Sequence, residues 1–306
     1  MNVLLLGLLA FSSWTALQAQ NPNTGTPPRE AEEAKEAPAK TREAEPDPPA
    51  LDPRIKQPDV KEGAKNPVEN AAAESLFQRG VQAYGAENYE AAIDFLEKAV
   101  QAAPGVSRYH DWLGKAYGRR AERVIFIRAI VLARKARNEF ARAAELDPTN
   151  IEAWSDLLDY DLQAPGFLGG GLDRAKAVAA KLATLNAAEG HRAQALIRAA
   201  EKDHAGAERE YRAALALEPA NPGRLLELAS FLNERHRYAE ADALFDQAEK
   251  LAPDSPDYLF TRGQQLVASK RDPIRARQLL QAYLRSNRKP EDPPPSEVQG
   301  LLKKLL

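Results

Sequence analysis

The sequence predicts an all-α protein built from helical repeats. Dense helical periodicity with short turns begins near Ala73. Alanine recurs at the positions where two helices of one unit must touch. Each unit then closes on a short segment that ends in proline, and Pro219 and Pro253 lie 34 residues apart, a period typical of helical repeat arrays. The closing segments are AVQAAP (99–104), AAELDP (143–148), ALALEP (214–219) and AEKLAP (248–253).

Residues 1–19 have the features of a secretory signal peptide. An apolar run extends from Val3 to Phe11, and small and polar residues follow up to Ala19, after which we expect cleavage. The run is shorter than the ~20 residues that cross a bilayer, and no later segment is apolar enough to span one. We therefore expect an exported protein, periplasmic or extracellular, with retention by an uncleaved N-terminal anchor as the alternative.

Residues 20–70 differ in composition from the rest of the chain. They hold ten of the 22 prolines, alternate acidic with basic residues and contain almost no aromatic or large apolar residue. Such a segment cannot bury enough surface to offset its ordering entropy. We expect a disordered linker that holds the repeat array away from a surface.

Composition excludes several classes of chemistry. The chain has no cysteine and a net charge of −2, so we expect neither disulfides nor thiolate metal sites nor attraction to nucleic acid. Its four histidines lack the spacing of a metal site, and no nucleophile motif is present. We predict a non-catalytic protein without a cofactor or a metal.

The repeated positions resemble the tetratricopeptide repeat family. The pattern of a Leu-Gly pair, an aromatic residue, a central alanine, a later aromatic residue and a closing proline is clearest in the second unit. There it reads Leu113, Gly114, Tyr117, Ala136, Phe140, Ala143 and Pro148. The resemblance covers 73 to about 289 and implies a right-handed superhelical solenoid of about six units. We place the array at 71–289 and, after a proline-rich break, a linker and C-terminal capping helix at 290–306.

The second unit is longer than the pattern requires. The distance from Gly114 to Pro148 exceeds the equivalent distance from Gly80 to Pro104 by ten residues, so we expect both helices of this hairpin to be extended. Between Lys115 and Arg142 the sequence has nine basic residues against two acidic ones. One interpretation is a protruding basic and apolar hairpin that contacts an acidic partner or an anionic lipid surface. The alternative is that its apolar residues pack inward and its arginines are solvated.

The third unit has a stretched turn between its helices, QAPGFLGGG at 163–171. Glycines before a helix can bind an anion, but the residues that follow do not match a phosphate-binding loop. We interpret the segment as a structural loop. Phe167 near its tip is either a partner contact or packs beneath the loop.

The resemblance also implies where a partner would bind. In this family the first helix of each unit forms the inner, concave wall, and its mixed chemistry suits an extended peptide or a partner helix. We predict an interaction scaffold in the cell envelope, with a structural spacer of an envelope complex as the alternative. The candidate partner-binding residues, on this wall, the basic hairpin and the glycine-rich loop, are Phe77, Tyr84, Asp111, Lys115, Arg119, Arg123, Arg128, Phe167, Arg192, Asn233 and Phe260.

Overall fold

The computed structural model describes residues 67–306, with side chains from Ala71 onward. These residues belong to one compact unit. They form thirteen α-helices and one short 3-10 helix, with no strand in this part of the chain. The expected signal peptide and nearly all of the expected linker lie outside the described residues.

Twelve of the helices form six consecutive hairpins, and a thirteenth follows them. The first helices of the hairpins are α2 (Pro67–Gly85), α4 (Ser107–Ala121), α6 (Ile151–Gln163), α8 (Ala187–Ala200), α10 (Pro222–Glu234) and α12 (Pro256–Ala268). The second helices are α3 (Tyr89–Ala102), α5 (Phe126–Leu146), α7 (Leu172–Leu185), α9 (His204–Leu217), α11 (Tyr238–Leu251) and α13 (Pro273–Arg285). The last helix is α14 (Pro295–Lys303), and the 3-10 helix η1 (Gly166–Leu168) lies between α6 and α7.

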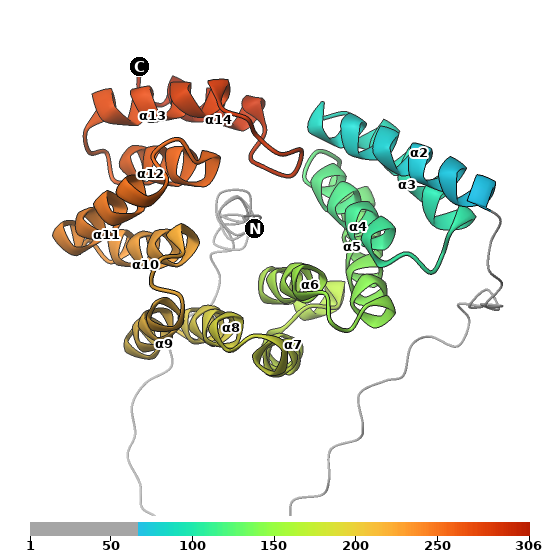
Figure 1. Cartoon of the computed structure of the whole chain (residues 1–306), viewed down its shortest axis with the longest axis horizontal. Helices are drawn as coiled ribbons and strands as arrows, with labels where there is room; N and C mark the ends of the chain where they lie inside the picture. Colours follow the sequence, from blue (N-terminus) through green and yellow to red (C-terminus); the bar gives the residue numbers. More distant parts are fainter. Residues whose placement is uncertain (1–66) are drawn as a thin grey trace, which may run out of the picture. The chain divides into compact units, whose positions relative to one another are not determined.

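Each helix packs on the helices before and after it, and first helices also contact the first helix of a neighbouring unit, as in α4–α6, α6–α8 and α10–α12. Figure 1 shows α6, α8, α10 and α12 on the inside of the curve, with α7, α9, α11 and α13 outside them. The first helices therefore make the inner layer. The predicted all-α solenoid of six units is confirmed.

Small residues set the distance between the two helices of a hairpin. Ala92, Ala136, Ala207 and Ala241 are completely buried where the helices cross. Glycine is required at the facing position in some units: a Cβ added to Gly114 would lie 2.7 Å from the Phe140 ring. The alanine positions of the sequence pattern are thus contact positions between helices, because a larger side chain would force the backbones apart.

The ends of the helices follow from local chemistry. The closing prolines lie two residues beyond the ends of α3, α5, α9 and α11, since proline disfavours helical geometry in the residue before it. Asparagine side chains cap two of the helices that follow, Asn150 at α6 and Asn221 at α10. In four of the turns inside hairpins, residues other than glycine adopt a positive φ; these residues are Glu87, Lys202, His236, Lys270 and Asp272, the last two in one turn.

The extension of unit two lies almost entirely in its second helix. Helix α5 has 21 residues, whereas α3, α7, α9 and α11 each have 14. Helix α4, with 15 residues, is close to the length of α8. The expectation that both helices are lengthened was wrong for α4. A short connection follows the last turn of α4. The additional residues belong to α5, which begins at Phe126.

Helix α14 closes the last unit. Val298 and Leu301 are buried against the core of the last units, and α14 packs on α12 and α13. The predicted capping helix is therefore confirmed, because it covers apolar surface that a further repeat would otherwise cover. Among the described helices, none is both long and apolar enough to cross a bilayer.

Candidate functional site: a polar wall on the inner helices

The inner helices carry an unusual set of buried charges. Asp111 and Lys115 on α4, Asp159 on α6, Arg192 on α8 and Arg224 on α10 are each no more than 5% exposed. Charged groups are seldom buried to this extent unless they are paired. Together with the carboxylates that contact them and the buried amides farther along, we call this set the polar wall.

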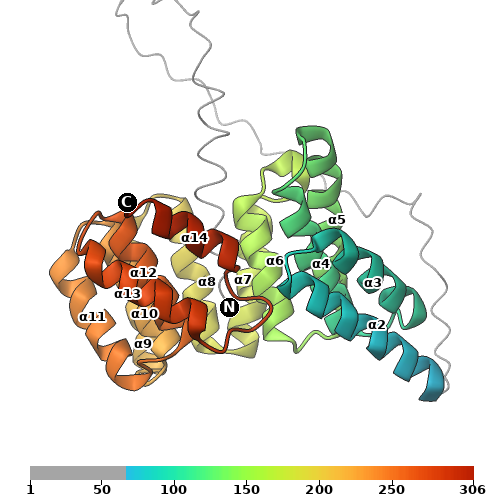
Figure 2. The ribbon, with the colours of Figure 1, turned by 90° about the horizontal axis from the view of Figure 1, so that it is seen from above.

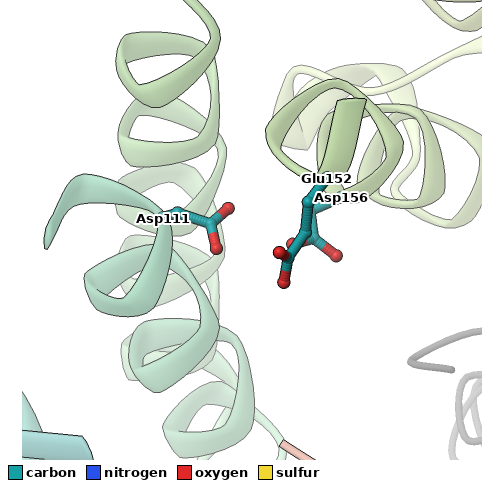
Figure 3. A group of neighbouring side chains, drawn as sticks. All are labelled: Asp111, Glu152 and Asp156. Atoms are coloured by element: carbon teal, nitrogen blue, oxygen red, sulfur yellow. The ribbon is translucent and has the colours of Figure 1, made fainter. Parts of the chain in front are cut away.

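The first part of the polar wall is an ion-pair cluster between α4 and α6. The Nζ of Lys115 lies 2.8 Å from Asp111, 2.7 Å from Glu152 and 3.1 Å from Asp156. Figure 3 shows Asp111 on α4 facing the other two carboxylates on α6. One oxygen of each carboxylate lies within 4.8 Å of the others, a spacing that a cation can bridge. The Lys115 ammonium already contacts all three, so it supplies that positive charge itself.

Burial and charge alter the titration of this cluster. Burial, together with the neighbouring Asp156 charge, raises the pKa of Asp111 to about 8. The pKa of Lys115 is raised above its usual value because the charges of its carboxylate neighbours outweigh its burial. Lys115 therefore remains positively charged, and the cluster has more negative than positive groups.

The second part of the polar wall runs from α6 to α10. Arg192 lies 3.7 Å from Asp159 and donates a hydrogen bond of 2.9 Å to Glu227. Arg224 donates to Glu189 over 2.6 Å and to Glu218 over 2.9 Å. Burial raises the pKa of Asp159 to about 7, and Arg192 opposes that shift. Each arginine thus joins carboxylates from different helices.

The polar wall contains buried polar atoms without a hydrogen-bond partner among the described residues. They include Asp111 Oδ1, Asp159 Oδ1, Asn233 Oδ1 and Gln264 Oε1. Asn233 on α10 donates 2.7 Å to Gln265 on α12, which leaves its own oxygen free. An unpaired buried acceptor costs about 1–3 kcal/mol, and these four atoms have almost no accessible surface.

Not all predicted contact residues reach the polar wall. Phe77, Tyr84 and Phe260 belong to the core: Phe77 stacks on Tyr109 at 4.8 Å, and Phe260 packs on Tyr283 at 5.3 Å. These aromatic side chains hold neighbouring helices together, and they are no more exposed than the residues of the polar wall, at 5% or less. Asp111, Lys115, Arg192 and Asn233 do lie on the polar wall.

The basic residues of the α4–α5 hairpin are largely paired with carboxylates. Arg123 lies 2.6 Å from Glu87 and Arg120 lies 2.9 Å from Glu90. Both glutamates belong to the first unit. Arg119 contacts Glu122 at 3.1 Å and reaches Glu297 of α14 at 3.9 Å. Lys135, Arg137 and Arg142 contact Glu97, Asp161 and Glu145. The local excess of positive charge in the sequence is thus mostly neutralised, although Arg128 remains exposed.

The tip of this hairpin is apolar and exposed. Ile125 and Ile127 are each 73% exposed, and Phe126 and Val131 are more than half exposed. Inward packing of the apolar residues, the alternative drawn from the sequence, is therefore wrong for these four, because the tip reaches beyond the neighbouring helices (Figure 2).

The glycine-rich loop of unit three is fixed by α5. Arg134 donates two hydrogen bonds, of 3.2 and 2.7 Å, to the carbonyl oxygen of Phe167, whose side chain is about half exposed. The Gly171 amide donates to Asp161 O over 2.7 Å. Gly169 and Gly171 adopt positive φ, and a Cβ on Gly170 would lie 2.1 Å from Ala164 O. The glycines are needed for the path of the loop, which supports a structural role.

Several members of the polar wall are not among the residues predicted from the sequence, namely Glu152, Asp156, Glu189, Glu218, Arg224 and Glu227. The ion pairs that they form between units join residues about one repeat apart: Lys115 and Glu152 differ by 37 positions, and Arg192 and Glu227 by 35. A search for opposite charges at the repeat period, instead of within a local window, would have detected them.

The geometry defines a helical-repeat solenoid whose inner layer carries polar groups. Comparison with known proteins agrees. Residues 198–259 match the family model described as tetratricopeptide repeat. A thermophilic tetratricopeptide repeat protein from Thermus thermophilus superposes with a TM-score of 0.50 at 22% identity over 64% of this chain and 100% of its own. The fold is therefore that of a tetratricopeptide repeat solenoid, and residues 198–259 carry the sequence match to that repeat.

Two further solved structures are similar at lower scores. Pseudomonas aeruginosa pilF has 18% identity and a TM-score of 0.45, covering 76% of this chain and 99% of its own. A tetratricopeptide repeat protein from Parabacteroides merdae has 14% identity and a TM-score of 0.45, covering 77% and 99%. Among proteins with curated descriptions, none matches this sequence.

Proposed function

We propose that this protein is a non-catalytic interaction scaffold of the cell envelope that holds a segment of a partner protein against its polar wall. Tetratricopeptide repeat proteins generally act as adaptors that bind other proteins, and the repeat match and the fold support this class. The envelope location rests on the apolar N-terminal run from Val3 to Phe11.

The observation that carries the proposal is the set of unpaired buried atoms on the inner layer. A scaffold that only separated other components would need no buried polar groups on this layer, because apolar residues would stabilise it at least as well. Asp159, Asn233 and Gln264 instead retain acceptors without partners among the described residues. A bound segment pairs these acceptors after a local shift of the inner helices, since their residues are no more than 5% exposed.

The apolar tip of the α4–α5 hairpin is a second candidate contact. Ile125, Ile127 and Val131 expose apolar surface on one short stretch, and such surface often marks a contact with another protein or a membrane. The tip lies on a hairpin and the polar wall on the inner helices, so variants can separate the two sites.

The experiment is crosslinking in intact cells followed by affinity capture of the full chain. We expect Asn233→Ala with Gln264→Ala to lose the captured partner, and Ile125→Ser with Ile127→Ser to retain it. If only the tip variant lost the captured partner, the binding site would be the hairpin tip and not the polar wall. An unchanged capture in both variants would favour the structural spacer.

Mass spectrometry of the same sample tests export, since cleavage after Ala19 leaves Gln20 as the first residue.

A further inference from the structure

The exposed apolar side chains of this protein are concentrated at two turns. Among the described residues, six of the ten large hydrophobic side chains that are exposed lie at 125–131 and 167–172. The first group is at the start of the long helix α5, and the second is in and directly after the glycine-rich loop of unit three. We call the six side chains the apolar patch: Ile125, Phe126, Ile127, Val131, Phe167 and Leu172.

The structure brings the two groups of the apolar patch together. Ile127, Val131 and Arg134 are spaced by four and three residues, so they share one face of α5. Arg134 donates its two hydrogen bonds to the carbonyl oxygen of Phe167, and η1 packs on α5. The loop therefore lies beside the face that carries Ile127 and Val131. Figure 2 shows the end of α5 projecting beyond the neighbouring helices, with the loop of unit three next to it.

The charge on this part of α5 is positive. Residues 123–138 contain five basic residues and no acidic one. Carboxylates from other segments pair with three of the five, as described above. The other two are Arg128 and Arg134, which are both exposed. Within the described part of the chain neither of them forms an ion pair, and Arg134 binds a neutral carbonyl oxygen instead.

The acidic groups next to the apolar patch are already neutralised. Glu122, which directly precedes it in the sequence, contacts Arg119 at 3.1 Å. On the loop side, Asp173 is followed by Arg174, and both are exposed, so their charges offset each other. The apolar patch therefore adjoins two positive charges that no carboxylate of the described residues compensates.

This combination favours one kind of occupant. Ile125 and Ile127 are each 73% exposed, so they project from the fold and line no groove. A protein partner would have to supply a matching pocket, whereas the interfacial region of a bilayer accepts projecting apolar side chains in any arrangement. Anionic lipid head groups also attract Lys and Arg side chains that lie near the membrane surface. Since α5 is not apolar enough to cross a bilayer, such a contact is confined to the surface.

From these observations we infer that the apolar patch is a membrane-docking surface that inserts into the interface of a bilayer containing anionic lipids. Ile125, Ile127 and Val131 enter the boundary between head groups and acyl chains, and Arg128 contacts the lipid phosphates. The inference specifies the occupant of the second candidate contact named in the proposed function, and it rests on that proposal in this respect alone. It does not depend on the polar wall.

The test places a polarity-sensitive dye at single positions of the full chain. The chain has no cysteine, so one introduced cysteine labels one position. Val131→Cys carries nitrobenzoxadiazole in the apolar patch, and Leu251→Cys carries it at the end of α11; the native side chains are 54% and 50% exposed. The vesicles contain phosphatidylcholine alone or phosphatidylcholine mixed with phosphatidylglycerol. We expect the emission at position 131 to shift to shorter wavelength with the mixed vesicles only, and the emission at position 251 not to change.

Two matched variants test the apolar contribution. Ile125→Ser with Ile127→Ser removes apolar surface from the patch, and Leu217→Ser with Leu251→Ser removes two exposed leucines from the ends of α9 and α11. The dye at Val131→Cys reports insertion in each variant, so lipid binding through residues 1–19 does not hide a loss. We expect the first variant to need about tenfold more lipid for the half-maximal shift and the second less than about twofold more.

A second matched pair tests the contribution of charge. Arg128→Gln removes a positive charge beside the patch, and Arg209→Gln removes an exposed arginine from α9 that has no ion pair among the described residues. We expect the first to weaken insertion into the mixed vesicles about fivefold and the second to leave it unchanged. Melting curves check that all variants fold. The inference is overturned by the absence of a shift at position 131, by an equal shift without phosphatidylglycerol, or by equal losses within either pair.

Other occupants of the patch would give different results. A shift that appears without vesicles as the protein concentration rises would show that a second copy covers the patch, and would overturn the inference. Benzophenone attached at Val131→Cys then identifies what touches the patch when the full chain is added to a cell-envelope fraction and illuminated. Crosslinks to lipid support the inference, whereas crosslinks to protein alone overturn it.

The two proposals fail differently. If the polar-wall variants lose a captured partner in cells while the dye at position 131 never enters lipid, the membrane contact is wrong and the scaffold function stands. If the dye enters anionic vesicles but the polar-wall variants capture partners normally, the membrane contact stands and the proposed function of the polar wall is wrong.

Discussion

Gly190 is a residue at which two helices of neighbouring units approach closely. A Cβ added there would lie 2.6 Å from the Cα of Ala183, and a backbone atom cannot rotate away as a side chain can. Only Asn186 separates α7 from α8, and its side chain caps α8. The close approach of α7 and α8 therefore depends on the absence of a side chain at this position.

We predict that Gly190→Ala destabilises the protein by about 1–3 kcal/mol because the two helices must move apart. Urea unfolding monitored by circular dichroism measures the change. The matched control is Gly118→Ala in α4, where a Cβ would meet no atom within 4 Å. That control should gain about 0.5–1 kcal/mol from the helix propensity of alanine. A Gly190→Ala variant as stable as the wild type would show that α8 can shift without cost.

At the scale of elements, the two irregular units depend on each other. Helix α5 contacts the glycine-rich loop after α6 through Arg134, which binds Phe167 O. Arg137 binds Asp161, which follows on α6. The second helix of unit two thus supports the insertion in unit three through Arg134 and Arg137.

We predict that Arg134→Ala loosens this loop while leaving the array folded. The amide hydrogens of Leu168 and Gly169 form turn bonds of 2.8 and 2.9 Å inside the loop. Their hydrogen exchange should accelerate about fivefold, equivalent to a local loss of about 1 kcal/mol. Arg128→Ala, which alters an exposed arginine on the same helix, provides the comparison. Equal exchange in the two variants would exclude a supporting role for Arg134.

The sequence was sufficient to predict the hairpins and their boundaries, because those depend on local patterns. Alanine spacing and closing prolines identified the helix contacts and the helix ends. The pairing of charges was not predictable from local windows, since Arg123 contacts Glu87 and Arg120 contacts Glu90 in the preceding unit. The aromatic candidates Phe77 and Phe260 were assigned to the inner wall but lie in the core. A first helix has one face on the inner layer and another in the core, and a shift of one residue along the helix moves a side chain from one face to the other.

At the scale of the whole molecule, buried carboxylates make stability depend on pH. Burial raises the pKa of Asp111 to about 8 and those of Asp159 and Glu297 to about 7. Between the ordinary carboxyl range and these values the folded state holds more protons than the unfolded state, so stability falls as pH rises through this window.

We predict that the free energy of unfolding is larger near a pH of about 5.5 than near about 8.5, by an amount on the order of 1–2 kcal/mol. Urea titrations at the two pH values measure it. Asp159→Asn should reduce the difference because it removes one group that must ionise inside the protein, and the exposed Asp94→Asn should not. Stability that rises over the same interval would show that these carboxyls are already charged at the lower pH.

The two ends of the described array are joined by a small set of contacts, which we call the clasp. Glu87, in the turn between α2 and α3, accepts hydrogen bonds of 3.2 Å from the Ser296 amide and 2.5 Å from its hydroxyl, across 209 positions of sequence. Burial acts to raise the pKa of Glu87, but the bonds from Ser296 and Arg123 lower it overall. A carboxylate of the first unit therefore caps the N-terminus of α14, where negative charge is favourable.

The clasp should make the two ends of the array unfold together. Repeat arrays ordinarily fray from their terminal units, since each unit contacts only its neighbours. We predict that Glu87→Asn, which tolerates the positive φ of this turn but is too short to reach Ser296, raises hydrogen exchange about tenfold both in α14 and in the turn between α2 and α3. Glu90→Ala removes a carboxylate of the same unit that binds only Arg120 among the described residues, and it should leave α14 unchanged. Faster exchange confined to the α2–α3 turn would mean that α14 is held by its apolar contacts with α12 and α13, and that the two ends unfold independently.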